Sequence, residues 1–279
     1  MDFIIALTII LGVLPLKSNG ANNNFGQYYT YLWGTDHFWV NPQGTEVQLK
    51  MDKQSGAGFK SKSDFGSGSF HIKLKTPDKR TKGIVTSFYL TSDPDDGKPA
   101  GNHFELDFEF WGVDNRVQTN VFDNDGGHRE QRFHLWFDPS KDFHTYQIIW
   151  NSHQIVFMVD NIPIRVFKNN TAKGVVFPNK SMHVEASIWN APFAGSPVAW
   201  SQAPFIAHYQ DFGLDACSAP AGSEDISHCS SQQYFWNKPE YWELSAEQRQ
   251  QMNRHRKSYM FYDYCASKTT RKPECSLNE

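Results

Sequence analysis

The sequence lacks a long apolar run, an excess of charge of one sign and, before position 217, any cysteine. Its 279 residues include 27 Lys and Arg against 30 Asp and Glu, so the net charge of −3 creates no strong field toward nucleic acid or anionic lipid. The apolar run Phe3–Leu16 is shorter than the roughly 20 residues of a spanning helix, and Pro15 interrupts it. We therefore expect neither nucleic acid nor a membrane as a partner of the mature chain.

The N-terminal apolar run has the length of the hydrophobic region of a secretory signal peptide. Ser18, Asn19 and Gly20 follow it where cleavage would occur, although Asp2 stands where a positive charge is usual. The alternative is a buried N-terminal helix. We expect residues 1–20 to form a signal peptide and the mature protein to be secreted.

The four cysteines, Cys217, Cys229, Cys265 and Cys275, lie in the last quarter of the chain. Four cysteines allow three pairings, and pairing of sequence neighbours would close two local loops, Cys217–Cys229 and Cys265–Cys275. A zinc site is the alternative, but no C-x-x-C pair is present, so we expect disulfides and no bound metal. In a secreted protein, Asn169 and Asn179 would be glycosylation acceptors, because each begins an N-x-S/T sequon.

Short strand-like segments separated by turn-forming residues dominate the chain from Tyr28 to Phe212. The clearest cover residues 46–51, 69–74, 83–90, 145–150, 154–159 and 183–188. Asp160 and Asn161 separate two such segments and predict a hairpin turn. Because no helical period lies between the segments, the pattern predicts an all-β antiparallel sandwich or barrel.

The chain changes character after Cys217. Ser245 and Gln248 have the Ser-x-x-Gln form of a capping box, which predicts a helix to about Lys257, and residues 259–264 return to strand character. We expect residues 21–215 to form the sandwich. Residues 216–279 should form an extension that packs on the sandwich and adds a strand to it.

The segment His103–Phe110 (HFELDFEF) alternates strictly between polar and apolar residues. His103, Glu105, Asp107 and Glu109 share one strand face, and the apolar residues share the other. A solvated strand face is the simplest interpretation, but three like charges in a row destabilise an unliganded strand. Catalysis or a divalent metal ion would explain them.

Paired carboxylates suit glycoside hydrolysis. A retaining glycosidase holds its nucleophile and its acid/base about 5–5.5 Å apart. The Cα atoms of Glu105 and Glu109 would be roughly 13 Å apart on a strand, so their side chains would have to lean toward each other. Asp107 between them could hydrogen-bond one glutamate, which would help to hold the pair in different protonation states.

The segment HFELDFEFWG resembles the H-x-E-x-D-x-E-F motif of glycoside hydrolase family 16, in its plant xyloglucan endotransglucosylase/hydrolase branch. The resemblance continues over nearly the whole chain after residue 20. Further matches lie at residues 32–37, 55–61, 118–122, 129–132, 135–139, 142–146, 159–165, 189–190, 203–205 and 273–275.

This resemblance implies a concanavalin-like β-jelly-roll sandwich with a concave cleft for a β-1,4-glucan chain, and a short disulfide-stapled α/β extension. It implies that Glu105 is the nucleophile, Glu109 the general acid/base and Asp107 an assisting carboxylate. The residues that it places in contact with sugar are His103, Gln118, Thr119, Asn120, His128, Arg129, Glu130, Trp189, Asn190 and Arg271.

The implied activity is retaining, endo-acting cleavage of a β-glucan backbone, followed by transfer to an acceptor chain. Such an enzyme needs no cofactor and would remodel polysaccharide of the plant cell wall as a secreted monomer. The resemblance also implies transfer rather than hydrolysis, because a longer loop around the cleft goes with hydrolysis in this branch and here only a short Gly126-Gly127 turn separates residues 118–120 from Arg129.

Two alternatives keep the fold and change the function. One is a relative that prefers another wall β-glucan, or that only binds glucan. The other is a lectin-like protein in which Glu105 and Asp107, joined by Asp114 and Asn115, hold calcium or manganese.

Four tryptophans, Trp33, Trp111, Trp189 and Trp200, are candidates for stacking against sugar rings. The chain departs from the family pattern at three places. Phe104 replaces an acidic residue, the sequon that usually follows the motif is absent, and residues 191–197 (APFAGSP) are shorter and less polar than the usual loop. That loop helps to bind the acceptor in the family, so its change bears on acceptor preference.

Overall fold

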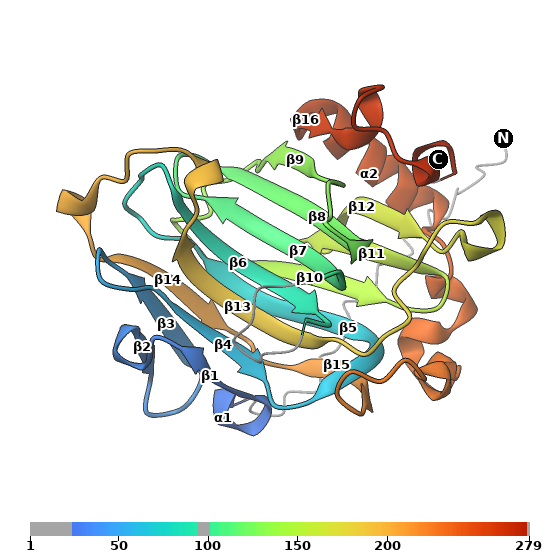
Figure 1. Ribbon diagram of the computed structural model, residues 1–279, viewed down its shortest axis with the longest axis horizontal. Coiled ribbons are helices and arrows are strands. Elements are labelled where there is room, and N and C mark those ends of the chain that lie inside the picture. Colours follow the sequence, from blue (N-terminus) through green and yellow to red (C-terminus); the bar gives the residue numbers. More distant parts are fainter. Residues whose placement is uncertain (1–23, 94–100, 278–279) are drawn as a thin grey trace, which may run out of the picture.

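The computed structural model describes residues 24–93 and 101–277 (Figure 1). The predicted signal peptide lies outside these residues. The strands are β1 (Tyr29–Trp33), β2 (Phe38–Val40), β3 (Glu46–Met51), β4 (Ala57–Ser61), β5 (Asp64–Lys75), β6 (Ile84–Thr91), β7 (His103–Trp111), β8 (Arg116–Asp125), β9 (Gln131–His134), β10 (His144–Trp150), β11 (Gln154–Val159), β12 (Ile162–Lys168), β13 (His183–Asn190), β14 (Phe205–Gln210), β15 (Leu214–Ala219) and β16 (Met260–Asp263).

Helices are few in the described chain. The α-helices are α1 (Phe25–Tyr28) and α2 (Ala246–Tyr259), and the 3-10 turns are η1 (Thr35–His37), η2 (Thr171–Lys173), η3 (Pro192–Ala194), η4 (Trp200–Gln202), η5 (Ser227–Ser230), η6 (Phe235–Asn237), η7 (Pro239–Tyr241), η8 (Tyr264–Ala266) and η9 (Pro273–Ser276). Among the described residues, no helix has both the length and the apolar character needed to cross a bilayer.

Two antiparallel sheets form the body of the molecule. Sheet A has the order β1-β4-β13-β6-β7-β8-β9-β16, and sheet B has the order β12-β11-β10-β5-β14-β3-β2, with β15 also paired to β5. Figure 1 shows the sheets stacked on each other, with α2 and the end of the chain gathered at one end of the stack. The predicted all-β sandwich is therefore confirmed.

Local sequence signals account for many of these elements. The segments predicted at residues 46–51 and 154–159 are β3 and β11, and the other four predicted segments overlap β5, β6, β10 and β13. Asp160 and Asn161 have φ values of 48° and 65°, which is the left-handed pair that a tight two-residue hairpin requires. The predicted hairpin is confirmed.

The apolar face of β7 fills the space between the sheets. Leu106 and Phe108 are fully buried, and the Phe108 ring lies 5.3 Å from Phe157 of β11 and 5.7 Å from Tyr146 of β10. Phe104 also joins this core, as its inward position predicted. Burying such a side chain contributes about 1.5–3 kcal/mol, so the core fixes which face of β7 points outward.

The C-terminal extension follows its sequence signals. Ser245 caps α2 in a capping box with Gln248, and α2 packs against β12. Strand β16 pairs with β9 and so adds a strand to the edge of sheet A, as predicted. Disulfides join Cys217 to Cys229 and Cys265 to Cys275, which confirms the pairing of sequence neighbours.

Candidate active site

The outward face of β7 presents Glu105, Asp107 and Glu109 in one row, because these residues alternate with the buried apolar set. A cleft of about 290 Å³ lies over this row. Its lining residues are Trp33, Ser87, Tyr89, Glu105, Asp107, Glu109, Ser187 and Trp189.

Strand register decides which residues flank the carboxylates. Asp107 lies opposite Tyr89 of β6 and Asn120 of β8. Glu109 lies opposite Ser87 of β6 and Gln118 of β8. Directly opposed residues share a sheet face, so these side chains surround the row on the cleft side.

Glu109 has the environment of a carboxylic acid. Burial raises its pKa, the hydrogen bond donated by the Gln118 amide opposes that rise, and the negative charge of Glu105 adds to it, so the pKa is about 7. The carbonyl oxygen of Gln118 accepts a 2.7 Å hydrogen bond from Nε of Arg132. Gln118 therefore connects the guanidinium group of Arg132 to the carboxyl group of Glu109.

Asp107 is buried between the two glutamates. Burial raises its pKa well above the ordinary value, the charges of Glu105 and Glu109 raise it further, and a hydrogen bond with Glu105 adds to the effect. The charge of Arg165 acts in the opposite direction. Asp107 is thus suited to keep its proton and to donate it in a hydrogen bond to Glu105.

His103 supplies a positive charge next to Glu105. Its Nε2 lies 3.4 Å from Oε2 of Glu105, and its Nδ1 lies 2.7 Å from the Gly101 carbonyl oxygen. Burial tends to lower the pKa of His103, but the hydrogen bonds to Glu105 and Gly101 outweigh it and raise the pKa to about 9. Glu105 therefore has a cationic neighbour, whereas Glu109 has the raised pKa of an acid.

These environments fit a pair in which one carboxylate attacks and one carboxylic acid donates a proton. Two titratable groups with environments that separate their protonation states are the usual mark of an acid/base pair. Among the predicted sugar contacts, Trp189 lines the cleft, Gln118 bonds Glu109, and Glu130 lies close enough for its charge to raise the pKa of Glu109.

Two other residues predicted to contact sugar, Asn120 and Asn190, have side chains that hydrogen-bond to the backbone. Oδ1 of Asn120 accepts hydrogen bonds from the backbone N–H groups of Val121 and Arg129, at 2.9 and 3.0 Å. The Asn190 amide donates to the Gly83 carbonyl oxygen at 2.8 Å. Asn120 is thus held to the backbone in the middle of β8, and Asn190 is held at the end of β13.

Three residues predicted to contact sugar do not line this cleft, and their contact with sugar stays a prediction. Thr119 is fully buried on the opposite face of β8, where its hydroxyl accepts a 3.1 Å hydrogen bond from Arg165. Arg129 is buried and donates to Glu274 and Asp125 at 2.8 and 2.9 Å. Trp200, predicted as a stacking platform, packs against the hydrophobic core.

His128 and Arg271 are both exposed, and neither lines the cleft. Trp33 does line it, because an irregularity in the pairing of β1 with β4 brings its indole over Gly58. A Cβ atom at position 58 would lie 2.7 Å from the Trp33 Nε1, so the glycine makes room for the ring.

Several residues at the site were not predicted from the sequence. Tyr89 lines the cleft, and Arg132 supports Gln118 while its guanidinium lies 5.0 Å from the Trp111 ring. Phe193 of the shortened loop is 57% exposed and contacts the rings of Trp111 and Trp189 edge to face. Period-two alternation in residues 83–90 could have indicated Tyr89, but only the fold brings Phe193 to these tryptophans.

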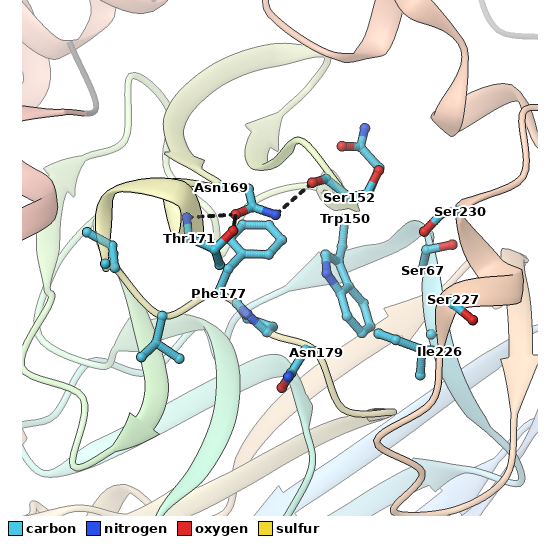
Figure 2. A pocket seen from close by; sticks show the side chains of 16 residues that line it. Ser67, Trp150, Ser152, Asn169, Thr171, Phe177, Asn179, Ile226, Ser227 and Ser230 are labelled. Carbon is cyan, nitrogen blue, oxygen red and sulfur yellow. Dashed lines mark hydrogen bonds between the residues drawn. The ribbon is translucent and has the colours of Figure 1, made fainter.

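A second cavity of about 500 Å³ lies away from the carboxylates (Figure 2). Trp150, Phe177, Asn169 and Asn179 are among its lining residues, and the described residues that line it include no acid, base or thiol. The Asn169 amide donates to the Ser152 carbonyl oxygen at 2.8 Å. Both sequon asparagines thus lie at one cavity that offers no acid/base chemistry, and their glycosylation stays a prediction.

The residues that could hold a metal ion do not support the lectin-like alternative. In the described part of the chain, Cys217, His228 and Cys229 form a cluster of metal-ligand type, but both thiols belong to the disulfide. Asp114 pairs with Arg116 at 2.7 Å, and Asn115 accepts a hydrogen bond from Arg80 at 2.9 Å. These two side chains are engaged at the turn beyond the far end of β7 from Glu105.

Known proteins resemble this chain in sequence and in fold. Residues 25–205 match the model of the glycosyl hydrolases family 16. Xyloglucan endotransglucosylase/hydrolase protein 3 of Arabidopsis thaliana is 47% identical over 254 residues, which are 88% of this chain and 85% of that protein. A xyloglucan endotransglucosylase/hydrolase of Brassica oleracea var. botrytis is 41% identical over 280 residues, covering 96% and 90% of the two chains.

Among solved structures, a Bacillus licheniformis beta-glucanase superposes with a TM-score of 0.55 at 24% identity, covering 66% of this chain and 89% of that one. The Crh5 transglycosylase in complex with NAG superposes with a TM-score of 0.54 at 22% identity, covering 74% and 88%. At these identities the likeness concerns the fold alone.

Proposed function

This chain belongs to glycosyl hydrolase family 16, in its xyloglucan endotransglucosylase/hydrolase branch, and from that premise we propose that it cuts and rejoins a β-1,4-glucan backbone with Glu105 and Glu109. The observation that carries the proposal is the row of three carboxylates on the cleft face of β7. Within that row, only Glu109 combines a pKa of about 7 with a direct hydrogen bond from Gln118.

In the first half of the reaction, Glu105 attacks the anomeric carbon of the donor sugar. The bond from that carbon to the glycosidic oxygen breaks, and Glu109 gives its proton to the departing oxygen. The product is a glycosyl-enzyme ester on Glu105 and a free chain end. His103 and protonated Asp107 hold the Glu105 carboxylate in place before attack.

In the second half, the ionised Glu109 takes a proton from an incoming hydroxyl group, whose oxygen attacks the anomeric carbon and releases Glu105. A sugar hydroxyl gives transfer and a water molecule gives hydrolysis. Two inversions at one carbon retain the anomeric configuration. The pKa of Glu109 suits both halves, because a group that titrates near 7 can donate and accept at neutral pH.

The wider setting is part of the same proposal. Donor and acceptor are cell-wall polysaccharides, xyloglucan or a related β-glucan, and Trp33 and Trp189 line the cleft that binds them. We propose that the protein acts outside the cell, in the plant wall, as a secreted monomer without a cofactor. Transfer is the main outcome, and the exposed Phe193 contributes to the choice of acceptor.

A transfer assay tests the proposal. The purified protein is incubated with xyloglucan, cellulose or mixed-linkage glucan and a labelled oligosaccharide, and label entering polymer is compared with reducing ends released. We expect label in polymer to exceed the release of reducing ends on at least one of these glucans.

The variant Glu105→Ala separates the enzyme from a binding protein. It should retain glucan binding and lose both transfer and hydrolysis, whereas a lectin that used Glu105 as a metal ligand would lose calcium-dependent binding. Absence of both transfer and hydrolysis by the intact protein on all three glucans would overturn the proposed function.

A further inference from the structure

A second group of polar side chains lies on the cleft side of sheet A and has no part in the reaction described above. Glu185 of β13 lies opposite Tyr89 of β6, which lies opposite Asp107. Strands are spaced about 4.8 Å apart, so Glu185 is roughly 10 Å from the carboxylate row. Glu185 and His183 are both buried, at 7% exposure, whereas Tyr89 lines the cleft.

These side chains form a chain of hydrogen bonds. The Tyr89 hydroxyl donates to Oε2 of Glu185. Nε2 of His183 lies 2.8 Å from Oε1 of Glu185, and Nδ1 of His183 lies 3.9 Å from Oδ1 of Asp64. An ionised carboxylate can only accept, so Tyr89 and His183 must both donate to Glu185.

This arrangement fixes the direction of the Tyr89 proton. The proton points along the sheet toward Glu185, and the lone pairs of the phenolic oxygen remain for the cleft. Burial and the charges of Glu185 and Glu105 raise the pKa of Tyr89 well above its ordinary value, so the hydroxyl group keeps its proton. Tyr89 therefore offers an acceptor to the cleft that also contains Glu105 and Asp107.

We infer that Tyr89 binds the donor sugar beside Glu105 by accepting a hydrogen bond from one of its hydroxyl groups. Glu185, held by His183, is the positioning residue that keeps Tyr89 in this accepting state. The inference rests on the proposed function, because it requires a glycan in the cleft. It differs from a purely structural role, in which Glu185 only balances charge with His183 and with Lys60, its neighbour across the β13–β4 register.

A double-mutant cycle tests the inference with the full chain and the glucan that serves as donor in the transfer assay. Tyr89→Phe removes the acceptor. In Glu185→Gln, the carbonyl oxygen of the new amide stays with His183 while its N–H group donates to Tyr89, which turns the Tyr89 proton toward the cleft. Each change should lower kcat/KM by roughly 3- to 10-fold, the effect of one hydrogen bond.

The test is decided by whether the effects of the two substitutions depend on each other. If Glu185 acts through Tyr89, Glu185→Gln should have no further effect when it is added to Tyr89→Phe, so the double variant should match Tyr89→Phe alone. Losses that multiply, or a Glu185→Gln enzyme with unchanged kcat/KM, would overturn the inference. Inactivity of the unaltered protein on every glucan would instead overturn the proposed function.

Two controls show whether a loss of activity is specific to the Tyr89–Glu185 pair and whether each variant folds. Glu46 of β3 lies 2.9 Å from His208 of β14 in sheet B, away from the cleft, so Glu46→Gln tests a similar Glu–His pair and should leave kcat/KM unchanged. Thermal melting shows whether each variant folds. If the double variant does not fold, His183→Gln replaces Glu185→Gln in the cycle, and its loss of activity should likewise disappear when Tyr89→Phe is already present.

Discussion

Two clusters of ionisable side chains in this protein differ in how their charges are arranged. On the cleft face of β7, three acidic side chains stand in a row, and the pKa values of Asp107 and Glu109 are raised. At the junction between the sandwich and the C-terminal extension, Arg129 donates hydrogen bonds to Glu274 and Asp125 at 2.8 and 2.9 Å. The junction groups its carboxyl side chains around Arg129, whereas the cleft places three carboxyl side chains next to one another on β7.

This difference separates a structural role from a chemical one. Glu274 accepts from both Arg129 and the Tyr264 hydroxyl, and its neighbour Cys275 is in a disulfide with Cys265, so the junction holds the extension on the sandwich. In the cleft row the pKa values of Asp107 and Glu109 are raised, so groups able to hold a proton lie beside Glu105, as glycosyl transfer requires. Both clusters contain buried side chains, so burial alone does not distinguish their roles. The hydrogen-bond partners of each carboxyl group do.

The largest expected effect breaks the cleft cluster. Glu105→Ala should reduce turnover by about 10⁴-fold or more, because the attacking carboxylate is absent. Its effect on the melting temperature should be small, because the variant loses the repulsion within the row together with the partner of His103 and Asp107. Transfer assays and thermal melting measure both quantities, and a melting point several degrees lower would show that the row stabilises the fold.

The corresponding change at the junction should do the reverse. Glu274→Ala leaves Arg129 with fewer partners in a buried site and should lower the unfolding free energy by about 3 kcal/mol. Turnover per folded molecule should stay near the original value. Urea unfolding measures the loss, and Glu243→Ala, at an exposed pair 3.4 Å from Arg249, is the control that should change stability by less than about 0.5 kcal/mol.

The pH dependence of stability should also distinguish Glu109 in the cleft from Asp125 at the junction. The pKa of Glu109 is raised from 4.5 to about 7, so the folded state binds this proton more tightly, and stability falls as pH rises through that interval. Glu109→Gln should remove this contribution, and its stability relative to the unaltered protein should increase from pH 4.5 to pH 7. Urea unfolding at several pH values gives the difference.

Asp125 at the junction is the matched control, because its pKa is lowered. Its contribution to the free energy of unfolding is present when the pH is above 3.8, the ordinary pKa of an aspartate. This contribution disappears as the pH falls through the lower pKa of Asp125 in the folded protein. Asp125→Asn should therefore remove stability that the unaltered protein loses only in acid. Equal slopes for both variants would contradict the distinction.

A smaller effect should follow from the link between the cleft and Arg132. Gln118→Ala removes a hydrogen bond that lowers the pKa of Glu109, so the alkaline limb of the pH–activity profile should move upward. We expect kcat/KM at neutral pH to fall by roughly tenfold, since Glu109 also loses its orientation. An unchanged profile would show that Gln118 does not act on Glu109.

The smallest effect concerns Thr119, next to Gln118 in the chain but on the opposite face of β8. Thr119→Val removes the hydroxyl that accepts a hydrogen bond from Arg165 and should lower the unfolding free energy by about 1 kcal/mol. The kinetic constants should remain within about twofold. A large rise in KM would show that Thr119 contacts sugar after all.

Features encoded by neighbouring residues were predictable. The alternation from His103 to Phe110 assigns the carboxylates to one face, and Ser245 with Gln248 marks the start of α2. The same alternation argues against Thr119 as a sugar contact, because Gln118 and Asn120 flank it on the other face. The prediction that Thr119 contacts sugar rests on family resemblance, and the strand alternation points the other way.

Features that depend on distant pairing were not predictable. Arg129 is buried because Glu274, 145 residues later, closes over it, and nothing near Arg129 in the sequence indicates that contact. Tyr89 and Glu185 are 96 residues apart and meet only because β6 lies next to β13.

The sequence alone determined the strand pattern, the carboxylate row, the helix cap and the pairing of neighbouring cysteines. Each of these depends on side-chain direction or on spacing within a short stretch of the chain. The tertiary structure decided which cations, amides and hydroxyl groups surround each carboxylate. Those neighbours follow from strand order and register, which are set by how the whole apolar core packs, and they raise the pKa values of Asp107 and Glu109.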